Sequence, residues 1–294
     1  MSVQNAGLAV LANKSQLLGI SAPEIKDARL LYSGRASGRD FICEGLWAAD
    51  KLIARGIHVK AVFYDSSYFA AGDTSESAAH TGARNFAELA TLCRLAAVSD
   101  SVYSVSAKAC SRISDRDGAD ICFCIAELPE YTPDSITLSD NMLAIILDGQ
   151  EQPGNIGAIL RSLDGAGGAF AVITNQRVKL THSRLIRSSL GAAFMLPVLE
   201  MDLGSAGRWL EANDFRIVLT DLTATKNYCD IPASGRVAVV AGNEHTGIDP
   251  RWRAMKNAEP VIIPMLGSVE SLNVGFASTL VAYNIGLRQK GLMK

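Results

Sequence analysis

Three loops in the C-terminal half of this 294-residue chain concentrate the polar residues that could do chemistry. They span residues 148–157, 242–248 and 264–273, and each follows a short apolar run typical of a buried strand. In open α/β sheets, ligands bind beyond the carboxyl ends of the strands. The sequence therefore predicts a site built from these three loops.

The first loop resembles a nucleotide-binding loop only in part. Gly149 and Gly154 have the spacing of a phosphate-binding loop, but Asn155 and Ile156 stand where Lys and Ser or Thr are required. The chain has no GxGxxG either, so triphosphate and dinucleotide sites are disfavoured. Asn155 and Arg161 then have two interpretations, as site residues or as a helix cap and a solvated surface cation.

The other two loops carry further candidates. Gly242 directly follows an apolar run, and a glycine there lets a ligand or another segment approach the backbone. Glu244 either contacts a ligand or caps the helix that follows. His245 is interpreted as a surface residue rather than a base. Ser271 is a candidate N-cap for a final helix over 272–287.

Apolar runs alternate with helical stretches along both halves, which predicts an α/β fold. The continuous apolar strands of the C-terminal half predict a parallel sheet covered on both faces. A smaller α/β unit precedes it, and two prolines with turn-forming residues over 128–135 predict a linker. The expected domains are 1–130 and 141–294, joined by 131–140. In the C-terminal half we expect strands at 142–147, 169–174, 217–219, 237–241 and 261–263, and helices at 156–166, 183–190, 206–212 and 272–287.

Together, the three loops resemble the motifs of a known family. The SpoU (TrmH) family, within the SPOUT superfamily, contains S-adenosylmethionine-dependent RNA ribose 2′-O-methyltransferases. The matching stretches are Asn155-x-Gly157-x-x-x-Arg161, Gly242-Asn243-Glu244-x-x-Gly247 and Ile263-Pro264-Met265-x-Gly267-x-x-x-Ser271-Leu272-Asn273. Residues 38–45 of the first half more loosely resemble an L30e-like substrate-binding domain of the ribosomal RNA members.

The resemblance implies a fold and a cofactor that composition does not reveal. The C-terminal domain is expected to form a deep trefoil knot, an exception to the rule that chains are unknotted. S-adenosyl-L-methionine is expected in the knot's loops. A homodimer with the site at the subunit interface is expected as well. The residues implied for the adenosine pocket are Gly242, Ile263, Gly267 and Leu272.

The resemblance also implies that Arg161 is the central catalytic residue. Because a guanidinium has a pKa above about 12, we interpret Arg161 as a fixed cation that favours the developing alkoxide, rather than as a base. The residues implied to orient Arg161, the ribose and the cofactor are Asn155, Glu244, Ser271 and Asn273.

Contacts to RNA phosphates need cations. The stretch 26–39 carries Lys26, Arg29, Arg35 and Arg39 against Asp27 alone. We predict an RNA-binding edge at Lys26, Arg35 and Arg39, with a solvated charged face as the alternative.

Composition narrows the remaining classes of function and partner. A net charge of −2 argues against indiscriminate polyanion binding, and the six cysteines form no CxxC pair, so no metal is expected. No apolar run is long enough to span a membrane, and no basic residue precedes the first apolar stretch, so a cytoplasmic location is expected. The alternative function is a non-catalytic RNA-binding or ribosome-assembly protein on the same scaffold. Ribosomal RNA is favoured over transfer RNA by analogy, and the sequence does not identify the modified nucleotide.

Overall fold

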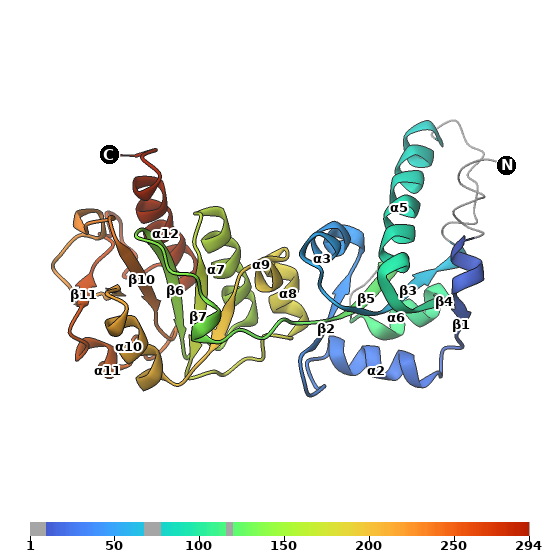
Figure 1. Ribbon diagram of the computed structural model, residues 1–294, viewed down its shortest axis with the longest axis horizontal. Helices are drawn as coiled ribbons and strands as arrows, with labels where there is room; N and C mark the ends of the chain where they lie inside the picture. Colours follow the sequence, from blue (N-terminus) through green and yellow to red (C-terminus); the bar gives the residue numbers. More distant parts are fainter. Residues whose placement is uncertain (1–9, 68–77, 116–119, 294) are drawn as a thin grey trace. The chain divides into compact units, whose positions relative to one another are not determined.

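The computed structural model describes residues 10–67, 78–115 and 120–293, and the chain divides into two compact units (Figure 1). Unit 1 comprises Met1–Pro129 with Thr181–Arg187, and unit 2 comprises Glu130–Leu180 with Ser188–Lys294. The expected boundaries, with a linker over 131–140, stay a prediction. Residues 1–9, from which no export leader was expected, lie outside the described residues.

Unit 1 is a five-stranded mixed sheet with helices on both faces. The strand order is β1-β4-β3-β5-β2, and β5 runs antiparallel to both of its neighbours. Helices α2 and α6 pack together over one face, where their buried side chains join those of the sheet. The elements are β1 (Gln16–Leu17), α2 (Pro23–Tyr32), β2 (Asp40–Glu44), α3 (Ala49–Arg55), β3 (Val59–Asp65), α5 (Ala78–Val98), β4 (Ser99–Val105), α6 (Ala107–Ile113) and β5 (Cys122–Glu127).

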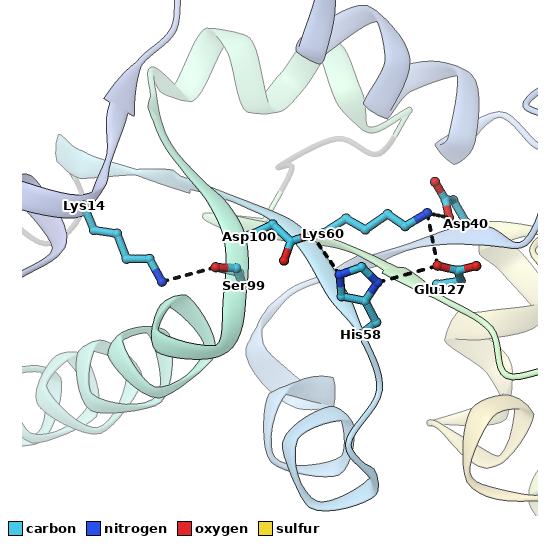
Figure 2. A network of polar contacts seen from close by, with 7 residues as sticks. All are labelled: Lys14, Asp40, His58, Lys60, Ser99, Asp100 and Glu127. Atoms are coloured by element: carbon cyan, nitrogen blue, oxygen red, sulfur yellow. Dashed lines mark hydrogen bonds and ion pairs between the residues drawn. The ribbon is translucent and has the colours of Figure 1, made fainter.

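A row of ionic contacts ties three strands of this sheet together (Figure 2). The pairing of β3 with β5 is irregular between Val59 and Ala61, and Lys60 lies at this irregularity. Its Nζ reaches Asp40 at 2.6 Å and Glu127 at 3.2 Å. The hydrogen bond to Asp40 raises the pKa of Lys60, and the hydrogen bond from Lys60 lowers the pKa of Glu127. Because these side chains are partly exposed, each pair adds little to the stability of the fold.

Unit 2 contains a six-stranded sheet in the order β11-β9-β10-β6-β7-β8, and every pairing in it is parallel. The predicted parallel sheet is therefore confirmed. Its elements are β6 (Met142–Asp148), α7 (Pro153–Gly165), β7 (Phe170–Thr174), α9 (Ala192–Met195), β8 (Val198–Glu200), α10 (Leu203–Ala212), β9 (Arg216–Thr220), β10 (Arg236–Ala241), α11 (Pro250–Arg253), β11 (Ala258–Val261) and α12 (Val274–Gln289). Most of α8 (Ser183–Ser189) belongs to the segment Thr181–Arg187, which is part of unit 1.

The strand sequences explain this architecture. All seven residues of β6 are buried, as expected for a central strand with helices on both faces. Ala144 and Ile146 face a core that includes Leu210 of α10. Helices α7 and α12 pack against each other and both contact β6, side by side in Figure 1. The sheet therefore presents the carboxyl ends of β6 and β10 together at one edge.

Several predicted boundaries are wrong, among them those of the helices and the strand that flank the three loops. Helix α7 begins at Pro153 instead of residue 156, because proline fits the first helical position. The strand expected at 261–263 ends at Val261 and begins at Ala258. The last helix begins at Val274, and its N-cap is Asn273, whose side chain accepts a hydrogen bond from the N–H of Gly275. Ser271 is therefore not the cap.

The deep trefoil knot stays a prediction, since strand pairing describes neighbours and not the threading of the chain. The L30e-like assignment of the first half stays a prediction as well. Among the described residues, no helix combines the length and the apolar character that a membrane span requires.

Candidate functional site

The three predicted loops meet beside the carboxyl ends of β6 and β10. Asn155, in the first turn of α7, donates from Nδ2 to Glu244 Oε1 at 2.9 Å. Its own Oδ1 accepts from Asn273 Nδ2 at 3.4 Å. One side chain from each loop thus takes part in a single chain of hydrogen bonds. Asn155 is not a helix cap, because the N-cap of α7 is Gln152.

Asn243 fixes the second loop internally and to the first. Its Nδ2 donates to the carbonyl of Gly149 at 2.7 Å and to Glu151 Oε1 at 3.2 Å. Its Oδ1 accepts from the backbone N–H groups of His245 and Thr246 at 2.8 and 2.9 Å. Because all of these contacts are to neighbouring loop atoms, Asn243 fixes the path of the backbone on which Glu244 sits.

A buried amide makes a second connection between the same loops. Gln150 donates from Nε2 to the carbonyls of Ala241, at 3.2 Å, and Gly242. Gly242 itself lies against the returning chain, since a Cβ there would be 2.6 Å from the backbone of Gly247 and Ile248. A glycine is thus required at 242 by close packing of two backbone segments.

These loops enclose a cavity of about 570 Å³, within the usual size range of small-molecule sites. Its apolar wall comes from the third loop and its flanks, and its polar wall from the second loop and the end of β9. Of the predicted site residues, the cavity is lined by Gly242, Glu244, Ile263, Ser271, Leu272 and Asn273.

The charge of the cavity restricts its ligand. Glu244 and Asp221 line it, and no Lys or Arg among the described residues does. Burial pushes the pKa of Asp221 up, but hydrogen bonds from Thr223 and the ion pair with Arg253 outweigh this effect and lower the pKa. A site lined by carboxylates, and by no Lys or Arg of the described residues, favours a cationic or neutral ligand over a polyphosphate.

Three predicted site residues do not line the cavity. Asn155 lies one hydrogen bond behind Glu244. Gly267 is exposed, and a Cβ added there would meet nothing within 4 Å. Arg161 is exposed on α7 and makes no hydrogen bond or ion pair with another described residue. Glu244 does not cap the next helix, because the N-cap of α11 is Asp249.

In the predicted RNA-binding edge of unit 1, some of the basic side chains already have partners within the protein. Arg39 donates from Nε to the carbonyl of Leu128 at 2.9 Å and from Nη2 to that of Pro129. Arg29 pairs with Asp115 at 2.8 Å. Lys26 and Arg35 are exposed and have no hydrogen-bond or ion-pair partner among the described residues.

Sequence reasoning missed three residues of the site, namely Gln150, Asn243 as a side chain with a role of its own, and Asp221. Asp221 follows directly after β9, and that position was the available signal. The two amides gave no signal of their own, because Asn and Gln are common in polar loops. His245, interpreted as a surface residue, lines the cavity. Within the described part of the chain, no group of three or more His, Cys, Asp or Glu residues is arranged to hold a metal.

Comparisons with known proteins find a family match in the half of the chain that contains the three loops. Residues 142–283 match the model of the SpoU rRNA Methylase family. A 23S rRNA (uridine(2479)-2′-O)-methyltransferase of Streptomyces viridochromogenes is 30% identical over 172 residues, which are 56% of this chain and 59% of that protein. The 23S rRNA (guanosine-2′-O-)-methyltransferase RlmB of Salmonella typhi is 33% identical over 159 residues, 54% of this chain and 65% of that protein.

The fold extends over more of the chain than these alignments. An rRNA methyltransferase from Sinorhizobium meliloti superposes with a TM-score of 0.78 and 22% identity, covering 96% of this chain and all of that one. The alignments to the two curated relatives span less than two thirds of each relative's length. Together with the match over residues 142–283, the three joined loops identify this part of the chain as a SpoU rRNA methylase family domain.

Proposed function

We propose that this protein transfers a methyl group from S-adenosyl-L-methionine to a ribose 2′-hydroxyl of RNA, with ribosomal RNA as the favoured substrate. The observation that carries the proposal is the hydrogen-bonded chain Asn273–Asn155–Glu244 beside a cavity that is lined by carboxylates and by no Lys or Arg of the described residues. The related proteins from Streptomyces viridochromogenes and Salmonella typhi, named as 23S rRNA 2′-O-methyltransferases, support the reaction and the substrate class.

The residues of the cavity fit the methyl donor. Ile263, Leu272 and Ala277 form an apolar wall suited to an adenine ring, and Glu244 supplies negative charge near a sulfonium and an ammonium group. The Sinorhizobium meliloti rRNA methyltransferase, which shares the fold, has been solved with AdoMet bound. A nucleoside triphosphate fits poorly, because no Lys or Arg of the described residues lines the cavity.

The remaining residues can align and activate the hydroxyl. S-adenosyl-L-methionine supplies a methyl group on a sulfonium, whose sulfur leaves as a neutral thioether. Arg161 would hold an RNA phosphate and stabilise the oxygen as its proton passes to solvent water. Glu244 and Asn155 would keep the loop groups in a fixed orientation, so that the two reactants meet in line.

A second copy of the chain would complete the site. Arg161 shares the exposed face of α7 with the small residues Gly154, Ala158 and Gly165. Tyr283 of α12 lies beside Gly165, and α12 exposes Phe276, Leu280 and Tyr283 at helical spacing, with Phe276 70% exposed. An apolar stripe of this kind beside an unpartnered catalytic candidate favours a homodimer in which one subunit's Arg161 faces its partner's cavity.

RNA would also contact unit 1. Lys26 and Arg35 remain available for phosphate contacts, whereas Arg39 holds the backbone at Leu128 and Pro129. The non-catalytic alternative has no support from the relatives, which are named as methyltransferases. The related 23S rRNA methyltransferases are bacterial proteins, which supports the cytoplasmic location that we propose.

Replacement of Arg161 tests the catalytic assignment. We expect Arg161→Ala to lower kcat for methylation of an unmodified 23S rRNA transcript by about a hundredfold or more, as removal of one oxyanion-stabilising donor does elsewhere. The affinity for S-adenosyl-L-methionine, measured by calorimetry, should remain within about twofold, because Arg161 does not line its own chain's cavity.

The matched control is Arg208→Ala, which removes an exposed arginine on α10 whose guanidinium hydrogen-bonds to Ser205. It should retain wild-type turnover. Near-normal turnover of Arg161→Ala refutes the role of Arg161, and absence of cofactor binding to the wild-type protein refutes the proposed reaction.

A further inference from the structure

A second cleft, of about 550 Å³, lies in unit 2 at the carboxyl ends of β6 and β7. It shares one wall with the first cavity, the hairpin formed by Asn243 and Gly247, whose backbones exchange hydrogen bonds of 2.9 and 3.0 Å. The opposite wall comes from Asn175 and Arg177, which follow β7 directly. No predicted site residue of the third loop lines this second cleft.

The floor of the cleft is a fixed polar surface. Asp148 is 2% exposed, and its carboxylate accepts from Thr174 Oγ1 at 2.8 Å, Asn175 Nδ2 at 2.7 Å and the N–H of Asp249 at 3.2 Å. The contact to Asn175 holds that residue in a left-handed conformation, with φ of 48°. Asn adopts this conformation more readily than most residues, and the contact with Asp148 fixes it here. The floor is therefore formed before any ligand arrives.

The charged side chains around the cleft differ in whether they have an ion-pair partner. Arg251, beside the cleft, donates to Asp249 twice, at 3.0 and 2.7 Å, and this contact lowers the pKa of Asp249 to about 2. These two charges cancel. Arg177 is exposed and makes no hydrogen bond or ion pair with another described residue. Among the described residues, Arg177 thus supplies an exposed guanidinium to the cleft, while the carboxylate of Asp148 is buried on its floor and Gln176 Nε2 donates to Glu200.

A guanidinium beside amide groups matches one nucleotide of a polynucleotide. The guanidinium forms charge-assisted hydrogen bonds with a phosphate, and Asn or Gln side chains can both donate to and accept from a ribose or a base edge. Because the hairpin separates this cleft from the methyl-donor cavity by a single wall, an RNA strand that enters one can continue into the other.

We propose that the cleft binds the RNA nucleotide adjacent to the methylated one, with Arg177 contacting its phosphate and Asn175 and Gln176 contacting its sugar or base. The assignment rests on the proposed function, because it takes the RNA substrate as the ligand. Arg177 is then a substrate-binding residue of the same chain that supplies the cofactor cavity.

The first test is the salt dependence of RNA binding. The full-length protein is titrated with an unmodified 23S rRNA transcript at several salt concentrations, and Arg177→Ala is compared with Arg208→Ala. Loss of one phosphate contact should weaken binding by about tenfold and reduce the slope of log K against log salt by about 0.7. Arg177→Lys should restore the slope, since it keeps the charge, but only part of the affinity.

The second test separates this cleft from the cofactor cavity. Arg177→Ala should raise KM for the transcript about tenfold, with kcat and the affinity for S-adenosyl-L-methionine unchanged. A fall in cofactor affinity would assign the cleft to the methyl donor and overturn the proposal. So would a variant that binds RNA like Arg208→Ala. If the wild-type protein binds the transcript without methylating it, the proposed function fails, while the salt slope still decides whether Arg177 contacts RNA.

Discussion

At the scale of single residues, the site is held by side chains that both donate and accept. Asn155 links Glu244 to Asn273, and Asn243 contacts four backbone or side-chain groups. An amide can do this and a carboxylate cannot, because an ionised carboxylate has no hydrogen to donate. Three loops that are far apart in sequence are thereby fixed without a metal or a disulfide among the described residues.

Gly242 provides a test of this arrangement. A Cβ at 242 would approach the backbone of Gly247 and Ile248 to 2.6 Å, and backbone has no rotamer with which to yield. We expect Gly242→Ala to displace the second loop and weaken S-adenosyl-L-methionine binding by about tenfold or more, as measured by calorimetry, with a lower melting temperature.

Gly267→Ala is the informative comparison. Its Cβ meets open space, so the melting temperature should stay at the wild-type value. A loss of cofactor affinity in this variant would then report a direct contact of residue 267 with the bound methyl donor. Full affinity in Gly242→Ala would contradict the steric argument for the second loop.

The sequence predicts single residues unevenly. Gly242 is predictable, because a glycine directly after an apolar strand indicates that another backbone segment or a ligand approaches closely. Gln150 is not, since its contacts are backbone carbonyls nearly a hundred residues away. The same holds for Arg39, predicted to bind RNA, whose guanidinium donates to two carbonyls. Counting charged residues over 26–39 does not show that backbone carbonyls elsewhere in the chain accept the hydrogen bonds of Arg39.

At the scale of elements, α7 and α12 form a packed helix pair, and Arg161 lies on the exposed face of α7. Their packing depends on small residues and on one polar contact. Thr279 Oγ1 donates to Ser162 Oγ at 2.7 Å, and Gly286 lies so close to α7 that a Cβ would be 2.2 Å from the carbonyl of Ala166. The relative position of the two helices is thus fixed by backbone contact.

Gly286→Ala should therefore destabilise the protein. The added methyl group forces α12 away from α7 and should lower the free energy of unfolding by about 1–3 kcal/mol, as measured by denaturant titration. Gly204→Ala in α10 is the matched control, because its Cβ meets only side-chain atoms of Arg208 and Asp202, at 3.3 and 3.4 Å. Equal stability of the two variants would show that the helices can separate without cost.

Elements are more predictable than their ends. Continuous apolar runs identify β6, β7 and β10, because a buried parallel strand tolerates little else. The strand β11 is harder, since Glu259 and Pro260 interrupt its apolar pattern. Glu259 is retained there because Arg216 and Lys226 pair with it. Its pairing partners belong to other segments, so no local pattern could reveal them.

At the scale of the whole molecule, one chain holds an incomplete site. Glu244 and Asn273 line the cavity, whereas Arg161 points from the exposed face of α7 and lacks a partner among the described residues. The exposed apolar residues of α12 lie on the helix that packs against α7. A homodimer through this surface would bury the apolar stripe and bring a second Arg161 to the cavity.

Complementation between two inactive variants tests this arrangement. Arg161→Ala lacks the cation, and Gly242→Ala binds the methyl donor weakly, so each homodimer should have little activity at an S-adenosyl-L-methionine concentration well below the Kd of Gly242→Ala. In a mixed dimer, one of the two sites combines an intact Arg161 with an intact cavity. If the dimer forms at random, about half of the dimers are mixed and each has one complete site, so about a quarter of wild-type activity should return. No recovery in a mixture whose subunits exchange, verified by mass spectrometry, would place Arg161 at its own chain's cavity instead. Phe276→Asp should abolish the recovery, because a buried, unpaired carboxylate opposes association at the stripe.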